Sequence, residues 1–159
     1  MDTIEKDIII IGGGPSGLAC ALEAAKLKMD YLVLEKGFLV NSIYNFPTNM
    51  TFFSTSQVLE IGEVPFISHT DKPSRKEALE YYRRVAESYD LDIRFRQKVA
   101  SVNKNKFLFE IKTQDNLYKC QYLVVATGYY DTPNMLNVPG EMLPKVKHYY
   151  DDAHPYIGQ

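Results

Sequence analysis

The sequence is poor in the residue types that mark several classes of site. It has no tryptophan, and its two cysteines, Cys20 and Cys120, lie too far apart for a C-x-x-C pair or a metal-binding spacing. Its net charge of −2 leaves no excess of lysine and arginine, which disfavours binding to nucleic acid or to an acidic membrane surface. No apolar run reaches the roughly 18 residues of a membrane span. The composition therefore predicts no metal, nucleic-acid or membrane binding.

Length and composition favour a single domain. Hydrophobic residues make up 45% of the 159 residues, enough for one hydrophobic core. The first residues show none of the basic, apolar and small-residue sections of a signal peptide. We therefore expect a cytoplasmic protein.

The first 36 residues read as a β-α-β unit. Asp7–Ile11 contains a run of four isoleucines without alternation, which is typical of a parallel strand buried on both faces. Leu18–Lys28 contains good helix formers with apolar residues on one side. A second apolar run, Tyr31–Leu34, predicts the next parallel strand. The connection between the two strands should be right-handed.

The glycines between that first strand and the helix predict a phosphate-binding loop. In Gly12-x-Gly14-x-x-Gly17, the first glycine permits a sharp turn, the second lets a pyrophosphate approach the backbone, and the third lets the helix pack closely on the sheet. The helix N-terminus directs its amides and a partial positive charge toward the phosphates. With a strand before it and a helix after it, the loop, which also holds Pro15 and Ser16, predicts a dinucleotide site.

An acidic residue ends the second predicted strand. Glu35 stands 18 residues after Gly17, at the position of the carboxylate that bonds the ribose hydroxyls of a bound dinucleotide. A carboxylate there disfavours a ribose 2′-phosphate, so we expect FAD or NAD(H) rather than NADP(H) at this site. Lys36 follows directly and is expected beside the same ribose.

Residues 37–70 show no regular pattern. So long an irregular stretch is usually functional or disordered, and its aromatic residues argue against disorder. Rings and polar groups together would suit a flat heteroaromatic ligand, and we expect Asn45 and Thr51 to line the flavin side of the site. The alternative is that the rings only pack the loop onto the core. The aromatic residues are Phe38, Tyr44, Phe46, Phe52 and Phe53.

The next part predicts one helix and three short strands. Ser74 and Glu77 form a capping box at the start of an amphipathic helix over residues 74–89. Strands are expected near Ile93–Phe95, Val99–Val102 and Phe107–Lys112, and the alternation in the last favours an antiparallel meander with one covered face. The apolar stripe of the helix comprises Ala78, Leu79, Tyr82, Val85, Ala86 and Tyr89.

A further buried strand, Tyr122–Ala126, ends in Thr127-Gly128. The segment YLVVATGYYDTPNMLNVPGE resembles the A-T-G stretch of two-dinucleotide flavoproteins, where the chain leaves the FAD domain for the NAD(P)H domain. With the opening unit, it is similar to the FAD-binding half of a thioredoxin-reductase-like oxidoreductase. The segments NSIYNFPTNMTFFSTS, IGEVPFI, ATGYYDTPN and LPKVKHYYDDAHPY closely resemble the YpdA family of bacillithiol disulfide reductases, and the resemblance covers nearly the whole chain.

The patterns and the resemblance together predict a doubly wound α/β fold. We expect a three-layered, Rossmann-like FAD/NAD(P)-binding domain with a parallel sheet and an antiparallel β-meander. The resemblance implies FAD as the bound cofactor, NADPH as the electron donor and a low-molecular-weight disulfide as the acceptor. It implies that the backbone of Val99 meets the adenine, and that Ala126, Thr127 and Gly128 close the pocket.

The resemblance also divides the chain. Residues 1–128 would form the FAD-binding domain, and residues 129–159 the linker and the start of an NADPH-binding domain. Family members are about twice as long, and this sequence holds neither their second glycine loop nor their late G-D motif. We therefore expect the chain to be an N-terminal portion that is inactive by itself, from a protein that forms a homo-oligomer.

One residue departs from the family pattern. The position of Ser16 is typically a cysteine there, proposed as the thiol that attacks the disulfide. An alcohol cannot serve as a redox thiol, so the departure affects disulfide chemistry and leaves flavin binding intact. The role expected for Ser16 is a hydrogen bond near a phosphate or the flavin edge. Cys20, one helical turn further on, is expected to be a packing residue rather than a substitute thiol, and Cys120 a structural one.

The three histidines have no metal-binding spacing. They are His69, His148 and His154. His148 lies in KVKHYY, which resembles the entry to the cofactor-binding half in the YpdA family and in flavin monooxygenases. An interface or packing role is expected for it, with proton handling as the alternative.

Two other functions stay open at this point. A flavin monooxygenase shares the glycine loop and the A-T-G-Y stretch, and it would oxygenate a soft nucleophile. A non-catalytic fragment that binds a nucleotide, or no ligand, and self-associates is the second alternative.

Overall fold

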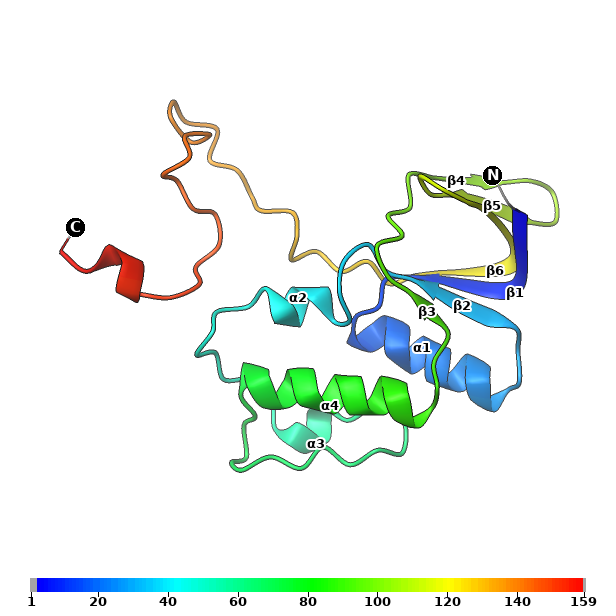
Figure 1. Ribbon diagram of the computed structural model, residues 1–159, viewed down its shortest axis with the longest axis horizontal. Helices are drawn as coiled ribbons and strands as arrows, with labels where there is room; N and C mark the ends of the chain where they lie inside the picture. The colour runs from blue at the N-terminus through cyan, green and yellow to red at the C-terminus, as the bar shows by residue number, and fades with distance from the viewer. Residues whose placement is uncertain (1–2, 159) are drawn as a thin grey trace.

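The computed structural model describes residues 3–158 as one mixed six-stranded sheet with helices (Figure 1). The strands are β1 (Thr3–Ile11), β2 (Tyr31–Leu34), β3 (Ile93–Arg94), β4 (Ser101–Lys104), β5 (Phe109–Lys112) and β6 (Leu117–Val125). The helices are α1 (Pro15–Lys26), α2 (Asn41–Tyr44), α3 (Ser56–Leu59), α4 (Arg75–Ser88) and the 3-10 helix η1 (His154–Tyr156).

The sheet combines a parallel half and an antiparallel half. Its order is β3-β2-β1-β6-β5-β4, with β3, β2, β1 and β6 parallel and β6, β5 and β4 antiparallel. The predicted α/β, Rossmann-like fold with a parallel sheet and a meander is confirmed. One part of the prediction is wrong: residues 93–94 pair in parallel with Val33 and Leu34 of β2, so the meander consists of β4, β5 and β6.

Both faces of the central strands are covered, which explains the unbroken isoleucine run. Ile10 is fully buried on the face against α1, where it clusters with Ala21 and Val33. Ile9 is fully buried on the opposite face, in a cluster with Tyr118 of β6 and residues of β2 and β5. In Figure 1 the helices lie on one side of β1 and β2, and the curled meander lies on the other. The three layers are therefore helices, parallel sheet and meander.

The predicted helix over residues 74–89 is confirmed with its capping box. The Ser74 side chain accepts from the Glu77 amide, and the Glu77 carboxylate accepts from the Ser74 amide. The predicted apolar stripe of this helix omitted Tyr81, whose ring is buried against Phe66 at a centroid distance of 4.3 Å. In the third short strand, Phe107 is 85% exposed, so the covered face begins at Phe109.

The segment 37–70 is mostly irregular, with α2 and α3 as its only helical turns among the described residues. Tyrosines of α4 fix it by its backbone: the Tyr81 hydroxyl donates to the Val64 carbonyl at 2.9 Å, and the Tyr82 hydroxyl donates to the Leu59 carbonyl at 3.1 Å. Burial raises the pKa of Tyr82 to about 12, so this hydroxyl stays protonated at neutral pH. Phe53 is 94% exposed and does not contribute to the core.

The residues after β6 leave the sheet and run outside its layers. Figure 1 shows this segment, in orange and red, extending away beyond α2 before it ends in η1. We call residues 129–158 the C-terminal segment. No helix in residues 3–158 is long and apolar enough to cross a bilayer.

Candidate functional site

A cavity of about 780 Å³ opens where β1, β2 and β6 end, which is the edge of a parallel sheet where ligands bind. We call it the glycine-loop cavity. It brings together most of the predicted site residues, from three loops that are far apart in the sequence. Its lining includes Gly12, Gly14, Pro15, Ser16, Glu35, Lys36, Val99, Ala126, Thr127 and Gly128.

The three glycines of the loop have the geometry expected of a phosphate-binding turn. Gly12 has φ 110°, and a Cβ there would overlap the Ala126 carbonyl. A Cβ at Gly17 would overlap the Gly12 carbonyl, so only glycine lets α1 begin this close to the loop. A Cβ at Gly14 would meet nothing within 4 Å in the described part of the chain. The backbone is therefore crowded at the first and third glycines and open at the second.

The N-terminus of α1 faces this open space. Gly14 is its N-cap, and no side chain among the described residues caps it. The first amides of a helix have no intrahelical partner and carry a partial positive charge, which suits an anionic group. Ser16 is exposed and lines the cavity, whereas Gly17 is buried beneath it. The loop thus has the space and the donors that a pyrophosphate needs.

Glu35 makes hydrogen bonds within the protein that the sequence did not indicate. The residue is 5% exposed, and its carboxylate accepts from the Gly13 amide at 2.6 Å and from the Gly37 amide at 2.7 Å. The side chain therefore ties the glycine loop to the loop after β2. Each carboxylate oxygen has a further lone pair, so both can still accept from ligand hydroxyls.

Asp131 is a cavity residue that the sequence reasoning missed. Its carboxylate lies 2.7 Å from the Lys36 ammonium, and both side chains line the glycine-loop cavity. The signal that could have found it is its place three residues after Gly128, in the loop that follows a parallel strand.

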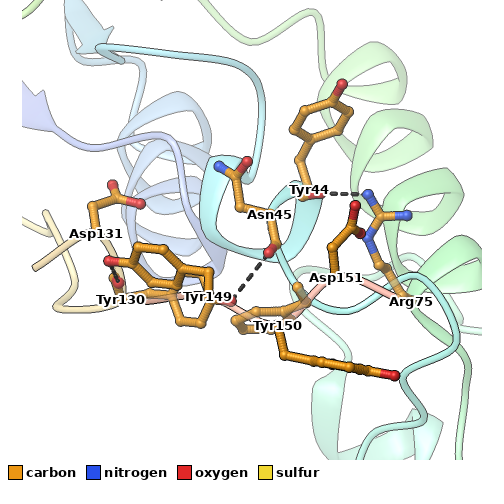
Figure 2. A pocket seen from close by; sticks show the side chains of 9 residues that line it. Tyr44, Asn45, Arg75, Tyr130, Asp131, Tyr149, Tyr150 and Asp151 are labelled. Carbon is orange, nitrogen blue, oxygen red and sulfur yellow. Dashed lines mark hydrogen bonds between the residues drawn. The ribbon is translucent and has the colours of Figure 1, made fainter. Parts of the chain in front are cut away.

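Asn45 and Thr51 do not line the glycine-loop cavity. Asn45 lines a second cavity of about 550 Å³ that is rich in aromatic residues, and we call this the aromatic pocket (Figure 2). Asp131 lines both cavities, which are therefore contiguous at this residue. Thr51 lies in a third hollow, on α4, and forms an isolated bridge with Ser74. The aromatic pocket is lined by Tyr44, Asn45, Phe46, Arg75, Tyr130, Asp131, Tyr149, Tyr150 and Asp151.

The cysteines and His148 lie in different surroundings and form no common site. Cys20 lines the glycine-loop cavity, whereas burial raises the pKa of the Cys120 thiol and keeps it protonated. His148 lies 3.2 Å from Glu141, whose pKa is lowered by hydrogen bonds from the Leu136 and Asn137 amides and from His148. No group of histidine, cysteine and acidic residues within residues 3–158 could hold a metal ion.

Residues 9–159 match the family model described as pyridine nucleotide-disulphide oxidoreductase. The chain belongs to that family. Among the pyridine nucleotide-disulphide oxidoreductases, bacilliredoxin reductase Bdr of Bacillus subtilis (strain 168) is 49% identical over 155 residues, covering 97% of this chain and 48% of the relative. The structure of bacillithiol disulfide reductase Bdr (YpdA) from Staphylococcus aureus superposes with a TM-score of 0.93 at 48% identity, over 96% of this chain and 47% of that one.

The chain thus spans about half the length of the relatives it matches. A flavin-containing monooxygenase from Stenotrophomonas maltophilia also superposes, with a TM-score of 0.72 and 22% identity over 79% of this chain and 39% of that one. At that identity the likeness shows a common fold. The predicted resemblance to the YpdA proteins is confirmed by sequence and by structure.

Proposed function

We propose that the glycine-loop cavity binds FAD, and that the chain is the FAD-binding portion of an NADPH-dependent flavoprotein reductase of low-molecular-weight disulfides, such as bacillithiol disulfide. The observation that carries the proposal is the open side of Gly14 in front of the uncapped N-terminus of α1. The 48% identity to the bacillithiol disulfide reductase Bdr (YpdA) from Staphylococcus aureus supports the acceptor class.

Each wall of the cavity has a proposed task. The loop from Gly12 to Gly17 holds the pyrophosphate on backbone amides, with Pro15 and Ser16 at the helix start. Glu35 accepts from the adenosine ribose, Lys36 lies beside it, and the backbone of Val99 meets the adenine. Bound FAD supplies the capacity to take a hydride from NADPH and pass electrons on. The remaining residues of the proposed site are Ala126, Thr127 and Gly128 at the closing wall. Asn45 is proposed toward the flavin from the contiguous aromatic pocket, whereas Thr51, which was expected there too, lies in the separate hollow on α4.

Ser16 limits the disulfide step. A hydroxyl donates a hydrogen bond to a phosphate or to the flavin edge, but it does not form a disulfide with a substrate sulfur. Cys20, which also lines the cavity, belongs to the packed face of α1, in contact with the cluster around Ile10. We propose that Ser16 binds rather than reacts.

The FAD site is tested with Gly14→Ala. The added methyl group occupies the phosphate approach, so the FAD dissociation constant should rise about tenfold or more, the order expected for lost charge-assisted hydrogen bonds. Thermal unfolding without FAD is the control, because alanine as an N-cap costs only about 1 kcal/mol. Titration by flavin fluorescence gives the affinity. Equal FAD affinity in both proteins would contradict a pyrophosphate at this loop.

The acceptor is tested in a chimera in which this chain replaces the matching half of the Bacillus subtilis relative. With FAD and NADPH present, Ser16→Cys should raise the rate of bacillithiol disulfide reduction, whereas Ser16→Ala should not. Slow NADPH oxidation by oxygen should be similar in all three versions. If the serine and cysteine versions reduce the disulfide equally fast, the thiol position is not limiting and the role given to Ser16 is wrong.

Ser16 also favours a second candidate function, that of a flavin monooxygenase. With serine in place of the cysteine, the chain lacks the expected thiol but keeps the proposed flavin site. A probable indole-3-pyruvate monooxygenase, YUCCA4 of Arabidopsis thaliana, is 31% identical over 83% of this chain and 33% of that protein. Oxygen uptake by the chimera, coupled to hydroxylation of a soft nucleophile, would favour this candidate. Anaerobic disulfide reduction would oppose it.

A further inference from the structure

The ion pair between Lys36 and Asp131 joins two loops across the end of the central strand. Lys36 follows β2 and Asp131 follows β6, and the sheet order puts β1 between those strands. Two strand spacings make about 10 Å, so the pair spans the edge from which the glycine loop rises. Its N–O distance is 2.7 Å, and both side chains line the glycine-loop cavity.

Asp131 is held in place by its neighbour, Tyr130. The Tyr130 hydroxyl donates to the Asn45 carbonyl at 3.0 Å, and its ring packs edge-on against Phe46 at 4.8 Å. The Tyr149 hydroxyl donates to the Tyr130 carbonyl at 2.7 Å, and Figure 2 shows these two rings side by side. The carboxylate is therefore presented to Lys36 by a fixed stretch of backbone.

We propose that Asp131 is a positioning residue for the dinucleotide: by pairing with Lys36, it closes the mouth of the glycine-loop cavity and slows the release of FAD. This inference rests on the proposed function, because it assumes FAD in that cavity. Closure links the loop after β6 to the loop after β2, on the two sides of the pyrophosphate position. Through the contact between Tyr130 and Tyr149 it also couples the cavity to the later part of the C-terminal segment.

A direct contact between Lys36 and the ligand makes a different prediction. If Lys36 acted only as a cation for the phosphates or the ribose, removing the Asp131 charge would free it and strengthen FAD binding. If the pair acts as a closure, the same change weakens binding. Exchanging the two charges would restore a closure but would not restore a cation at position 36. The two mechanisms therefore differ in whether Asp131→Asn strengthens or weakens FAD binding, and in whether exchanging the charges at positions 36 and 131 restores it.

The experiment measures FAD affinity and dissociation rate for four versions of the chain by flavin fluorescence. Asp131→Asn and Lys36→Met should each weaken binding about two- to fivefold, the range of a partly exposed ion pair, mainly through faster release. The exchange Lys36→Asp with Asp131→Lys should return both values to within about twofold of the original, as in a double-mutant cycle. High salt should reduce the differences.

Asp115→Asn is the matched control, because it changes the net charge equally at an exposed turn between β5 and β6. It should leave FAD binding unchanged, and circular dichroism melting checks that each variant is folded. If Asp131→Asn binds FAD as well as or better than the original chain, or if the exchange does not restore binding, the closure is overturned. If the original chain binds no FAD, the proposed function fails, and this inference fails with it.

Discussion

The body around β1 and the C-terminal segment are held by different forces. In the body, Ile9, Ile10 and Leu18 are fully buried, and each belongs to an apolar cluster. In residues 129–158 the one buried residue is an anion, Glu141, and large apolar side chains such as Leu136 and Met142 are exposed. The body is held by burial, and the segment by a few hydrogen bonds and ring contacts.

The body should therefore be stabilised more strongly than the C-terminal segment. Burying one large apolar side chain contributes about 1.5–3 kcal/mol, whereas a hydrogen bond contributes a net 0.5–1.5 kcal/mol or so. Local opening should therefore begin in the C-terminal segment, well below the free energy of global unfolding. The site lies at the boundary, since Gly14 and Glu35 belong to the body and Asp131 to the segment.

The largest effect is expected from Gly17→Ala. Alanine usually stabilises a helix relative to glycine by about 1 kcal/mol, but here the methyl group would overlap the Gly12 carbonyl. We expect a loss of roughly 3 kcal/mol or more in the free energy of unfolding. Urea denaturation measures the free energy of unfolding of Gly17→Ala and of Gly14→Ala, and the second variant should lose far less stability. A Gly17→Ala protein as stable as the original would show that α1 can shift away from the loop.

The next largest loss of stability is expected from Glu77→Gln. Hydrogen bonds from Ser74, His69 and Ser68 lower the pKa of Glu77 from 4.5 to about 2. Because the folded-state pKa is depressed, the stabilisation is complete above pH 4.5 and is lost as the pH falls toward 2. After allowance for solvent screening, we expect a loss of about 1–2 kcal/mol at neutral pH.

Glu80→Gln is the matched control for that change, because Glu80 is exposed on the same helix and pairs only with Arg83 among the described residues. Denaturation curves at several pH values should show the difference between Glu77→Gln and the original protein shrinking as the pH falls below 4.5. A difference that stays constant down to pH 2 would contradict the assignment of the effect to the carboxylate charge.

The smallest effect is expected from Tyr149→Phe, which removes the hydrogen bond to the Tyr130 carbonyl. Global stability should change by less than about 1 kcal/mol, because the body does not depend on this bond. Hydrogen exchange or limited proteolysis in residues 132–148 should nevertheless become several-fold faster. Tyr129→Phe is the control, since its ring is 90% exposed. Unchanged exchange would mean that the ring contacts alone hold the segment.

The sequence predicted the parts of the fold that are encoded locally. The glycine loop, the helix after it and the capping box of Ser74 and Glu77 each depend on neighbouring residues, and all are present. The pairing of β3 was mispredicted because two residues are too few to show a period, and their place is decided by parallel pairing with Val33 and Leu34 of β2. Tyr81 was missed because its burial depends on Phe66, which is brought in by an irregular loop.

The candidate site also has a part that could be predicted from the sequence and a part that depends on tertiary contacts. The residues of the glycine-loop cavity could be found because the ends of adjacent parallel strands meet at one edge. The position of Asp131 after β6 fits the same rule, but its pairing with Lys36 could not be predicted, because that pairing depends on how the chain turns after β6. Asn45 and Thr51 were expected together, but α2 and the bridge to Ser74 separate them into different hollows.

The pairing of β1 with β6 has a consequence for folding during synthesis. β1 is central in the sheet and is the first strand of the described chain, but its partner β6 is the last. Until β6 has been made, one edge of an isoleucine-rich strand has no permanent neighbour, and such edges associate readily with other chains. The long interval between the two strands also makes this a slow contact to form. The newly made chain should therefore be most dependent on chaperones just before residues 117–125 emerge from the ribosome.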